Sequence, residues 1–398
     1  MAENVYPSEG DAPEDTPDLK FRRLARELRQ RIRQGTWSAD GRIPTEKQLS
    51  MSSGTSVSTV RRAVDELVAE GLVVRRQGSG TFVLPPDAPG TGRALIGVVV
   101  PDTTFYYPRV LQGIEETLSA AGARLLLACS GYDQRRECKD LQDMLEAGVD
   151  GLLVVPTLTG AEPAERHLAW LSALPVPAVL MERRGTSLGD INEYVCTHHE
   201  AGAYDAVRHL AALGHQAVGL ALRDPSPTAS PVADGFRQAA AELGCVTTVF
   251  RASREEWSPA TADRCLAGLR AAGASAVVCF GDRQAAMLVG AARRAGLTVP
   301  GDLAVVAYDD EIADLADISL TAVAPPKHLL GATAAETLLR RLDNPGLPRR
   351  HVMLRPGITV RQSCGQRVPP PENHVGPASE TPRRVRTRNT LMKRETDS

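Results

Sequence analysis

The chain has 398 residues, 42% of them hydrophobic and 24% charged, a composition typical of a globular protein with two or three domains. No stretch approaches the roughly 18 uncharged apolar residues that a membrane span needs. The N-terminus is acidic and polar, unlike a secretory signal, so we expect a cytoplasmic protein that does not contact a membrane. The seven cysteines are scattered and form no C-x-x-C pair, which favours reduced thiols over disulfides or a zinc site.

Charge is unevenly distributed along the chain. Residues 1–18 are rich in Pro, Asp and Glu and are expected to be disordered. Residues 19–83 hold 13 Lys and Arg against 6 Asp and Glu, a balance of +7 in a chain whose net charge is −2. A basic block on an otherwise acidic chain is expected of a module that meets phosphate groups.

The basic block contains signals for three helices and a hairpin. Asp18 is placed to cap a first helix, Thr45 a second, and Ser56 a third that ends near Gly71. Apolar positions of the third helix fall on one side, and the other side carries Ser58, Thr59, Arg61 and Arg62. Two short β runs then flank the turn RRQGSG at 75–80, whose glycines allow the backbone to approach a phosphate closely. Such a unit can place a helix in the major groove beside a wing.

The rest of the chain alternates apolar runs with amphipathic stretches. Residues 84–92 are expected to form a linker, and the Pro-rich, basic segment 366–398 a disordered tail. The expected strands are Ile96–Val100, Leu125–Ala128, Leu152–Val155, Ala178–Met181, Val218–Leu222, Ala276–Phe280 and Leu303–Ala307. The expected helices are 108–121, 135–147, 199–213, 232–243, 260–272 and 282–295. This pattern over residues 93–365 predicts two α/β lobes with parallel sheets and a ligand cleft at the carboxyl ends of the strands.

In their order and spacing, the N-terminal residues resemble the winged-helix domain of the GntR family. The matching residues are Ile43-Pro44-Thr45-Glu46, Ser58-Thr59-Val60-Arg61-Arg62-Ala63 with Leu67, and Glu70-Gly71-Leu72 with Gln77-Gly78-Ser79-Gly80-Thr81-Phe82-Val83. The resemblance implies a helix-turn-helix domain that binds double-stranded DNA through Lys47, Ser56, Ser58, Thr59, Arg61, Gln77 and Gly78. The exposed helix side and the hairpin tip add Arg62, Arg75 and Arg76. The family often has arginine where this chain has Val57, so the preferred base at that position is expected to differ.

Residues 93–365 resemble the effector domain of the LacI family, whose two-lobed α/β fold is that of periplasmic sugar-binding proteins. The resemblance runs through the segments 96–130, 146–157, 176–184, 208–221, 279–285 and 299–311. A GntR-type domain on such an effector domain is the arrangement of the AraR-like subgroup, which Tyr106-Tyr107-Pro108 and Leu111-Gln112-Gly113-Ile114-Glu115 also resemble.

By that resemblance, the candidate effector-binding residues are Asp102, Tyr106, Tyr107, Glu182, Arg183, Asp282 and Asp309. Carboxylates and an arginine make directional bonds to the hydroxyls of a sugar, and aromatic rings stack on its C–H face. Each has an ordinary structural alternative. Asp282 is placed to cap the helix that it begins, Glu182 and Arg183 to pair with each other, and Asp309 to brace a loop.

Three departures from the LacI pattern leave the class of effector open. Val232 stands where arginine is frequent, Gly281 where asparagine is common, and His198-His199 where an aspartate usually leads. These departures point to an unusual sugar, a sugar derivative or no sugar at all. The adjacent histidines lack an evident third ligand, so we expect no metal site.

The leading hypothesis is a homodimeric repressor that binds a pseudo-palindromic operator. The resemblance implies that a small molecule, expected to be a sugar or a sugar derivative, releases it from DNA. No cofactor is expected. The rival classes are an enzyme fused to a DNA-binding domain and a transport-associated binding protein. The chain has no G-x-S-x-G, H-E-x-x-H or P-loop motif and no recognisable context for a cofactor lysine, which disfavours an enzyme.

Overall fold

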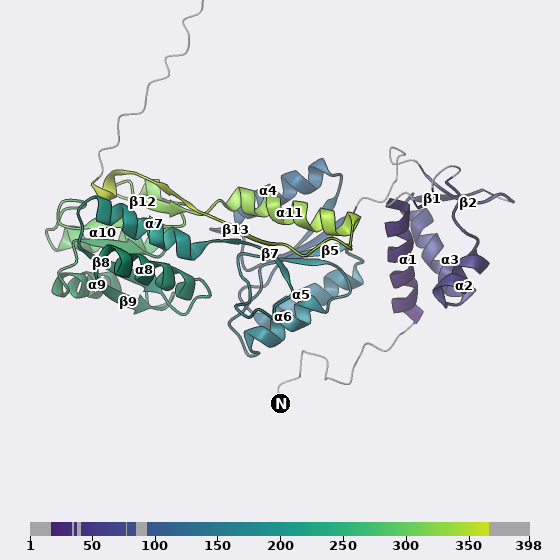
Figure 1. Ribbon diagram of the computed structural model, residues 1–398, viewed down its shortest axis with the longest axis horizontal. Helices are drawn as coiled ribbons and strands as arrows, with labels where there is room; N and C mark the ends of the chain where they lie inside the picture. Colours follow the sequence, from purple (N-terminus) through teal and green to yellow (C-terminus); the bar gives the residue numbers. More distant parts are fainter. Residues whose placement is uncertain (1–16, 34–35, 38–40, 77, 85–93, 366–398) are drawn as a thin grey trace, which may run out of the picture. The chain divides into compact units, whose positions relative to one another are not determined.

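The N-terminal part of the computed structural model is a three-helix unit followed by a β-hairpin (Figure 1). The structure describes residues 17–33, 36–37, 41–76, 78–84 and 94–365. The elements of this winged-helix domain are α1 (Pro17–Arg33), α2 (Glu46–Ser53), α3 (Val57–Ala69), β1 (Val73–Arg76) and β2 (Gly80–Val83). The expected N-terminal and C-terminal tails and the linker lie outside the described residues, apart from Pro17, Asp18 and Leu84.

Local cap chemistry fixes where α2 and α3 begin. The Thr45 hydroxyl accepts from the Gln48 amide, and the Gln48 side chain accepts from the Thr45 amide, which closes a capping box. Ser56 accepts from the Thr59 amide at 3.2 Å, as expected for the cap of α3. The expected cap of the first helix is wrong, because α1 already begins at Pro17 and Asp18 lies within it. Proline is well tolerated there, since the first amide of a helix has no partner within the helix.

The first lobe of the two-lobed domain is built on a parallel six-stranded sheet. Its strand order is β13-β7-β6-β5-β3-β4. These strands are β3 (Leu95–Val100), β4 (Arg124–Cys129), β5 (Gly151–Val154), β6 (Ala178–Met181), β7 (Glu193–Thr197) and β13 (His351–Leu354). The helices are α4 (Tyr107–Ala120), α5 (Gln134–Glu146), α6 (Ala164–Ser172) and α11 (Lys327–Asp343). The central β5 is buried along its whole length, as a parallel strand covered on both faces should be.

The second lobe repeats this plan with the strand order β14-β12-β11-β10-β8-β9, in which only β14 is antiparallel. Its strands are β8 (Ala217–Arg223), β9 (Val246–Ala252), β10 (Ala276–Cys279), β11 (Ala304–Tyr308), β12 (Thr321–Ala324) and β14 (Gly357–Thr359). Its helices are α7 (His199–Ala212), α8 (Ala229–Leu243), α9 (Pro259–Ala271) and α10 (Asp282–Arg294), with short 3-10 turns η1 (Ala313–Leu315) and η2 (Gln362–Cys364).

The chain passes between the lobes three times, from β7 to α7, from β12 to α11 and from β13 to β14 (Figure 1). The connections at 198 and 325–326 therefore lie where the carboxyl ends of both sheets meet. The expected strands and helices are all present, and β7, β9, β12, β13, β14, α6 and α11 were not among them. The seven cysteines, all among the described residues, form no disulfide, and five of them are buried. Within the described residues, no helix combines the length and apolarity that crossing a membrane requires.

Candidate functional site

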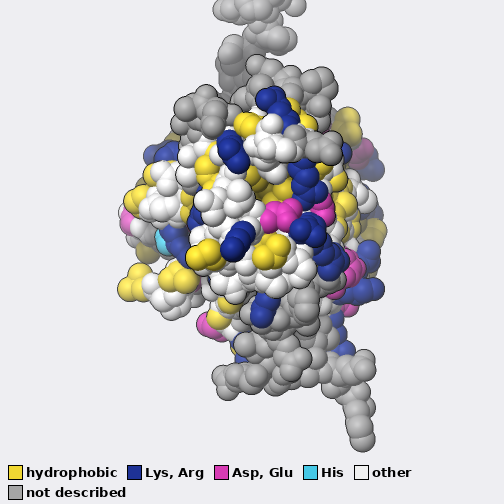
Figure 2. Space-filling model, turned by 90° about the vertical axis from the view of Figure 1, so that its right-hand side faces the viewer, with side chains coloured by type: hydrophobic (Ala, Val, Ile, Leu, Met, Phe, Trp, Pro, Cys, Tyr) yellow, Lys and Arg dark blue, Asp and Glu magenta, His cyan; other side chains and the backbone are white. Residues whose placement is uncertain are grey.

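Helix α3 buries one side and exposes the other. Val60, Val64 and Leu67 are buried in the core of the winged-helix domain. Ser58 and Arg61 are exposed on the outer side. Figure 2 faces the side on which α2, α3 and the hairpin lie in Figure 1, and it shows Lys and Arg side chains spread over the surface with a few acidic groups among them. A helix of this kind can keep its packing while polar side chains meet base edges.

Glu46, in the first turn of α2, links arginines of two other elements. Its carboxylate lies 3.0 Å from Nη2 of Arg61 on α3 and 3.1 Å from Nη2 of Arg75 on the hairpin. Arg75 also pairs with Asp65. These exposed ion pairs are weak in water, so phosphate oxygens can replace the carboxylates at little cost.

The other predicted DNA contacts lie on the same domain. The hydroxyl of Ser56 is 2.8 Å from those of Ser58 and Thr59, so the three form one polar cluster at the start of α3. Lys47 is exposed in α2. Gly78 is exposed at the hairpin tip with a φ of 75°, and Gln77 lies outside the described residues. The guanidinium of Arg76 lies 4.7 Å from the Phe82 ring centre within the hairpin.

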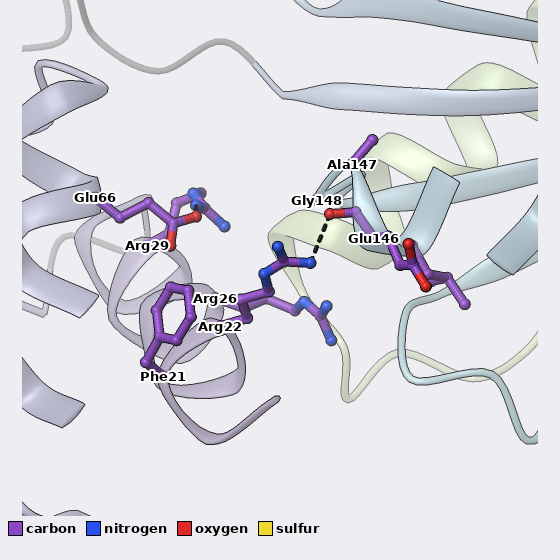
Figure 3. A pocket seen from close by; sticks show the side chains of 9 residues that line it. Phe21, Arg22, Arg26, Arg29, Glu66, Glu146, Ala147 and Gly148 are labelled. Atoms are coloured by element: carbon purple, nitrogen blue, oxygen red, sulfur yellow. Dashed lines mark hydrogen bonds and ion pairs between the residues drawn. The ribbon is translucent and has the colours of Figure 1, made fainter. Parts of the chain in front are cut away.

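Helix α1 holds α3 through charged and aromatic contacts. Nη2 of Arg29 lies 2.5 Å from Glu70 and 3.5 Å from Glu66. Figure 3 shows the side chains of Arg29 and Glu66 next to each other. The guanidinium of Arg62 lies 4.0 Å from the centre of the Phe21 ring on α1. Arg62 is thus a contact between helices as well as an exposed cation.

In the two-lobed domain, strained backbone gathers at the carboxyl ends of strands. The non-glycine residues with φ in the left-handed region, among those that the structure describes, are Tyr132 (64°), Glu182 (59°), Asp309 (97°) and Asp310 (55°). They follow β4, β6 and β11. Such conformations cost roughly 1–3 kcal/mol each and cluster at ligand-binding sites, so their shared location marks the boundary between the lobes as a candidate site.

Glu182 is the centre of a buried hydrogen-bond network. Its carboxylate accepts from the Tyr106 hydroxyl, from Oγ1 of Thr197 at 2.8 Å and from Nε2 of His199 at 3.2 Å. Burial opposes ionisation, but the hydrogen bond and charge of His199 outweigh it and hold the pKa of Glu182 below its usual range. Nδ1 of His199 lies 3.0 Å from the Tyr308 hydroxyl, so the network runs from the first lobe into the second. The described residues offer no cluster of His, Cys, Asp and Glu suited to a metal ion.

Asp282 holds the loop that follows β11. Its carboxylate accepts from the amides of Asp310, Glu311 and Ile312 at 3.3, 2.6 and 3.0 Å. It does not cap its own helix, so that alternative is wrong. Burial raises the pKa of Asp282 to about 6 even though three amides favour the ionised form.

Asp309 lies beside a buried lysine. Nζ of Lys327 donates to the Asp309 carbonyl oxygen, lies 2.7 Å from Glu311 and stands 5.1 Å from the Tyr106 ring centre. The side-chain carboxylate of Asp309 makes no hydrogen bond to another described residue, and burial raises its pKa. A loop brace is therefore wrong for this carboxylate, which has acceptor capacity to spare.

The remaining candidate effector-binding residues of the first lobe are Arg183, Asp102 and Tyr107. Arg183 is buried, and its Nη1 donates to the Pro156 carbonyl at 2.9 Å. Arg183 does not pair with Glu182 in the described structure, so that alternative is also wrong. Asp102 accepts from Thr104 and from the hydroxyl of Tyr132.

Tyr107 packs in the core of the first lobe, where its ring centre lies 5.3 Å from that of Tyr106. Only 5% of Tyr107 is exposed, which leaves little ring area for stacking on a ligand.

Two family profiles match this chain. The bacterial regulatory proteins of the gntR family match residues 20–83, and the periplasmic binding protein-like domain matches residues 207–364. An uncharacterized HTH-type transcriptional regulator in the aml 5′ region of Streptomyces limosus is 31% identical over 69% of this chain and 80% of its own length. The chain is an HTH-type transcriptional regulator with a gntR-type N-terminal domain.

The regulator is similar to full-length relatives as well. The arabinose metabolism transcriptional repressor of Geobacillus stearothermophilus is 29% identical over 86% of this chain and 97% of its own length. The crystal structure of the transcription regulator GntR from Chromobacterium violaceum is 26% identical, with a TM-score of 0.57, over 68% of this chain and 99% of that one. The regulator therefore combines a DNA-binding domain with a periplasmic-binding-protein-like domain in one chain.

The sequence did not single out three basic residues and one tyrosine that lie near the boundary between the lobes. These residues are Tyr132, Arg223, Arg254 and Lys327. A usable signal existed for Arg223, which directly follows the expected strand Val218–Leu222. Tyr132 and Arg254 stand in loops after β4 and β9, and nothing local distinguishes them from solvated loop residues.

Proposed function

We propose that the regulator represses carbohydrate-related genes and is released from its operator by a sugar or sugar derivative. The observation that carries the proposal is the meeting of buried polar side chains from both lobes around Glu182, in a chain that also bears a DNA-binding domain. The similarity to arabinose metabolism repressors over nearly their whole length supports a carbohydrate effector.

The geometry suggests how a ligand acts. Asp309 offers a carboxylate without a hydrogen-bond partner among the described residues, and the first lobe contributes Arg183 and Tyr106. A ligand that bonds to groups of both lobes favours the conformation in which they are closest. The chain crosses between the lobes three times, and these crossings can act as the hinge about which one lobe rotates against the other. As the ligand shifts the population of the regulator toward this conformation, its affinity for DNA falls.

We propose a homodimer that binds a pseudo-palindromic operator in the cytoplasm. The edge strands β4 and β9 occupy equivalent positions in the two sheets, and both expose apolar side chains. These are Leu126, Leu127, Val246 and Val249, which are 36%, 41%, 63% and 42% exposed. Exposed apolar edges of this kind favour association, and a twofold dimer presents two winged-helix domains to two half-sites.

We infer that the regulator binds its effector without converting it. Its relatives are regulators, and the polar groups at the lobe boundary mostly bond to one another. Incubation of the protein with its effector should therefore return the molecule unchanged, by mass spectrometry.

The direct test is fluorescence polarisation with DNA from the gene's own upstream region at fixed salt. We expect tight binding by the full chain and its loss on addition of one member of a panel of sugars and sugar derivatives. Arg61→Ala should weaken DNA binding, while Arg237→Ala on α8, an exposed arginine of the two-lobed domain, should not. Tight binding that no ligand disturbs would refute the release mechanism.

A further inference from the structure

Two arginines, one from each lobe, flank the Tyr132 ring, and a third, Arg223, ends the strand next to one of them. The guanidinium carbon of Arg183, after β6, lies 5.2 Å from the centre of the Tyr132 ring, and that of Arg254, after β9, lies 5.9 Å from it. Arg223 ends β8 beside Ala252 of β9, and its guanidinium lies 5.1 Å from the Phe280 ring. Arg223 and Arg254 therefore stand at the ends of adjacent strands of the second lobe, and Arg254 approaches the Tyr132 ring of the first lobe.

Most of the hydrogen-bonding capacity of these arginines is unused. A guanidinium carries five N–H donors. Arg183 donates one to a carbonyl oxygen, and Arg223 and Arg254 form no hydrogen bond or ion pair with any residue that the structure describes. The neighbouring Arg251, in contrast, pairs with Asp224 at 2.7 Å. Because Arg183 is only 8% exposed, its charge lacks both full hydration and an anionic partner.

Most carboxylates of the same region already have hydrogen-bond or ion-pair partners. Asp102 accepts from Thr104 and Tyr132. Glu182 accepts from four donors and Asp282 from three. Glu311 pairs with Lys327. Asp309 keeps a carboxylate without a hydrogen-bond partner among the described residues, and the charge of Arg223 acts on it. Where the lobes meet, the arginines without an ion-pair partner among the described residues therefore outnumber the carboxylates without one.

We propose that the effector is an anionic sugar, one that carries a carboxylate or a phosphate, and that Arg183, Arg223 and Arg254 bind this group. The inference rests on the proposed function and specifies its ligand. Guanidinium groups match the geometry of carboxylate and phosphate oxygens. Tyr132, with 40% of its surface exposed among the arginines, offers a face for the sugar ring, and Asp309 accepts from sugar hydroxyls. An anion contacted by both lobes draws them together.

Titration calorimetry on the full chain compares three anionic probes with their neutral counterparts. The probes are galacturonate, gluconate and ribose 5-phosphate, and the neutral set is galactose, glucose and ribose. We expect at least one anionic probe to bind ten or more times more tightly than its neutral counterpart, with an affinity that falls as salt rises. Arg223→Gln and Arg254→Gln should each weaken that binding about tenfold.

Arg237→Gln, which alters an exposed arginine on α8, is the matched control and should change nothing. The proposal is overturned if no anionic probe binds, if neutral sugars bind as tightly, or if both glutamine variants retain wild-type affinity. DNA binding, followed by polarisation in parallel, separates the two claims. A neutral sugar that releases DNA would refute the anionic effector and support the proposed function. An anionic sugar that binds without lowering DNA affinity would support the anionic ligand and refute the proposed release from DNA.

Discussion

Asp282 illustrates how burial and hydrogen bonding compete at a single residue. Its side chain is fully buried, and burial raises its pKa from 3.8 to about 6 despite three amide donors. The folded chain therefore binds this proton more tightly than the unfolded chain does. The resulting contribution to stability is complete below about pH 4 and is lost as the pH rises through about 6.

Asp282→Asn should remove this pH dependence. The free energy of unfolding of the wild type, minus that of the variant, should decrease by up to about 3 kcal/mol between pH 4 and 7 and then level off. Urea denaturation across this range measures the difference, in which other titrating groups cancel. A difference that stays constant or grows with pH would show that Asp282 ionises freely in the folded protein.

Val57, the first residue of α3, is 41% exposed beside the polar cluster of Ser56, Ser58 and Thr59. Val57→Arg should create a preference for guanine at one operator position, because arginine binds O6 and N7 of guanine together. We expect about a tenfold gain over the other bases, read by polarisation on operators varied at each position. Met51→Arg on α2 adds the same charge at a site that is 79% exposed, and it should raise affinity without altering base preference. Equal base preference in the two variants would exclude base contact by residue 57.

The role of a residue could be predicted from the sequence where its hydrogen-bond partner is only a few residues away along the chain. The caps at Thr45 and Ser56 depend on amides three residues away, so the local pattern was sufficient. Asp282 bonds to amides near 311, and Glu182 to His199 and Tyr106. Those partners meet only after the sheets have formed, so no local pattern could assign their roles.

At the scale of elements, glycines set how closely helices pack. A Cβ built on Gly113 of α4 would lie 2.0 Å from the His328 carbonyl oxygen of α11, and one on Gly331 of α11 would lie 2.0 Å from the Val110 carbonyl oxygen of α4. The second lobe uses the same device, since a Cβ on Gly235 of α8 would lie 1.9 Å from the carbonyl oxygen of Glu200. Each lobe thus has one helix pair in backbone contact.

Gly235→Ala should therefore destabilise the second lobe by about 1–3 kcal/mol, because backbone cannot yield as a side-chain end can. Gly268→Ala on α9 is the matched control. Nothing lies within 4 Å of its added Cβ, so it should be neutral or stabilising by up to about 1 kcal/mol. Urea denaturation compares the two variants, and equal stability would mean that α7 and α8 separate at no cost.

Element types were predictable where hydrophobic periodicity was strong. Six of the expected helices are followed by a glycine in the sequence, and all six glycines have positive φ, namely Gly122, Gly148, Gly214, Gly244, Gly273 and Gly296. Edge strand β9 was missed because its half-exposed pattern of Thr, Val and Arg lacks a continuous apolar run. Helix α11 was missed as well, and its packing on α4 joins segments about two hundred residues apart, which no local signal encodes.

At the scale of the whole molecule, the exposed edges of both sheets bear on assembly. Leu127→Lys on β4 and Val249→Lys on β9 should each weaken the dimer, because burying an unpaired ammonium in an apolar contact is costly. Sedimentation equilibrium should show a raised dissociation constant, and operator affinity should fall at concentrations where the variants are monomeric. Arg124→Lys, at the start of β4 and exposed, is the control. Unchanged assembly in both variants would place the dimer contact elsewhere.

The central claim is that the effector, bound to the two-lobed domain, and the operator, bound to the winged-helix domain, each lower the affinity of the regulator for the other. Titration calorimetry tests it directly, with the effector that releases DNA added to the free regulator and to the regulator saturated with operator. Linkage requires the effector to bind the DNA complex more weakly, by the same factor by which it lowers operator affinity. We predict such a matched loss. An effector affinity that DNA leaves unchanged would contradict the account.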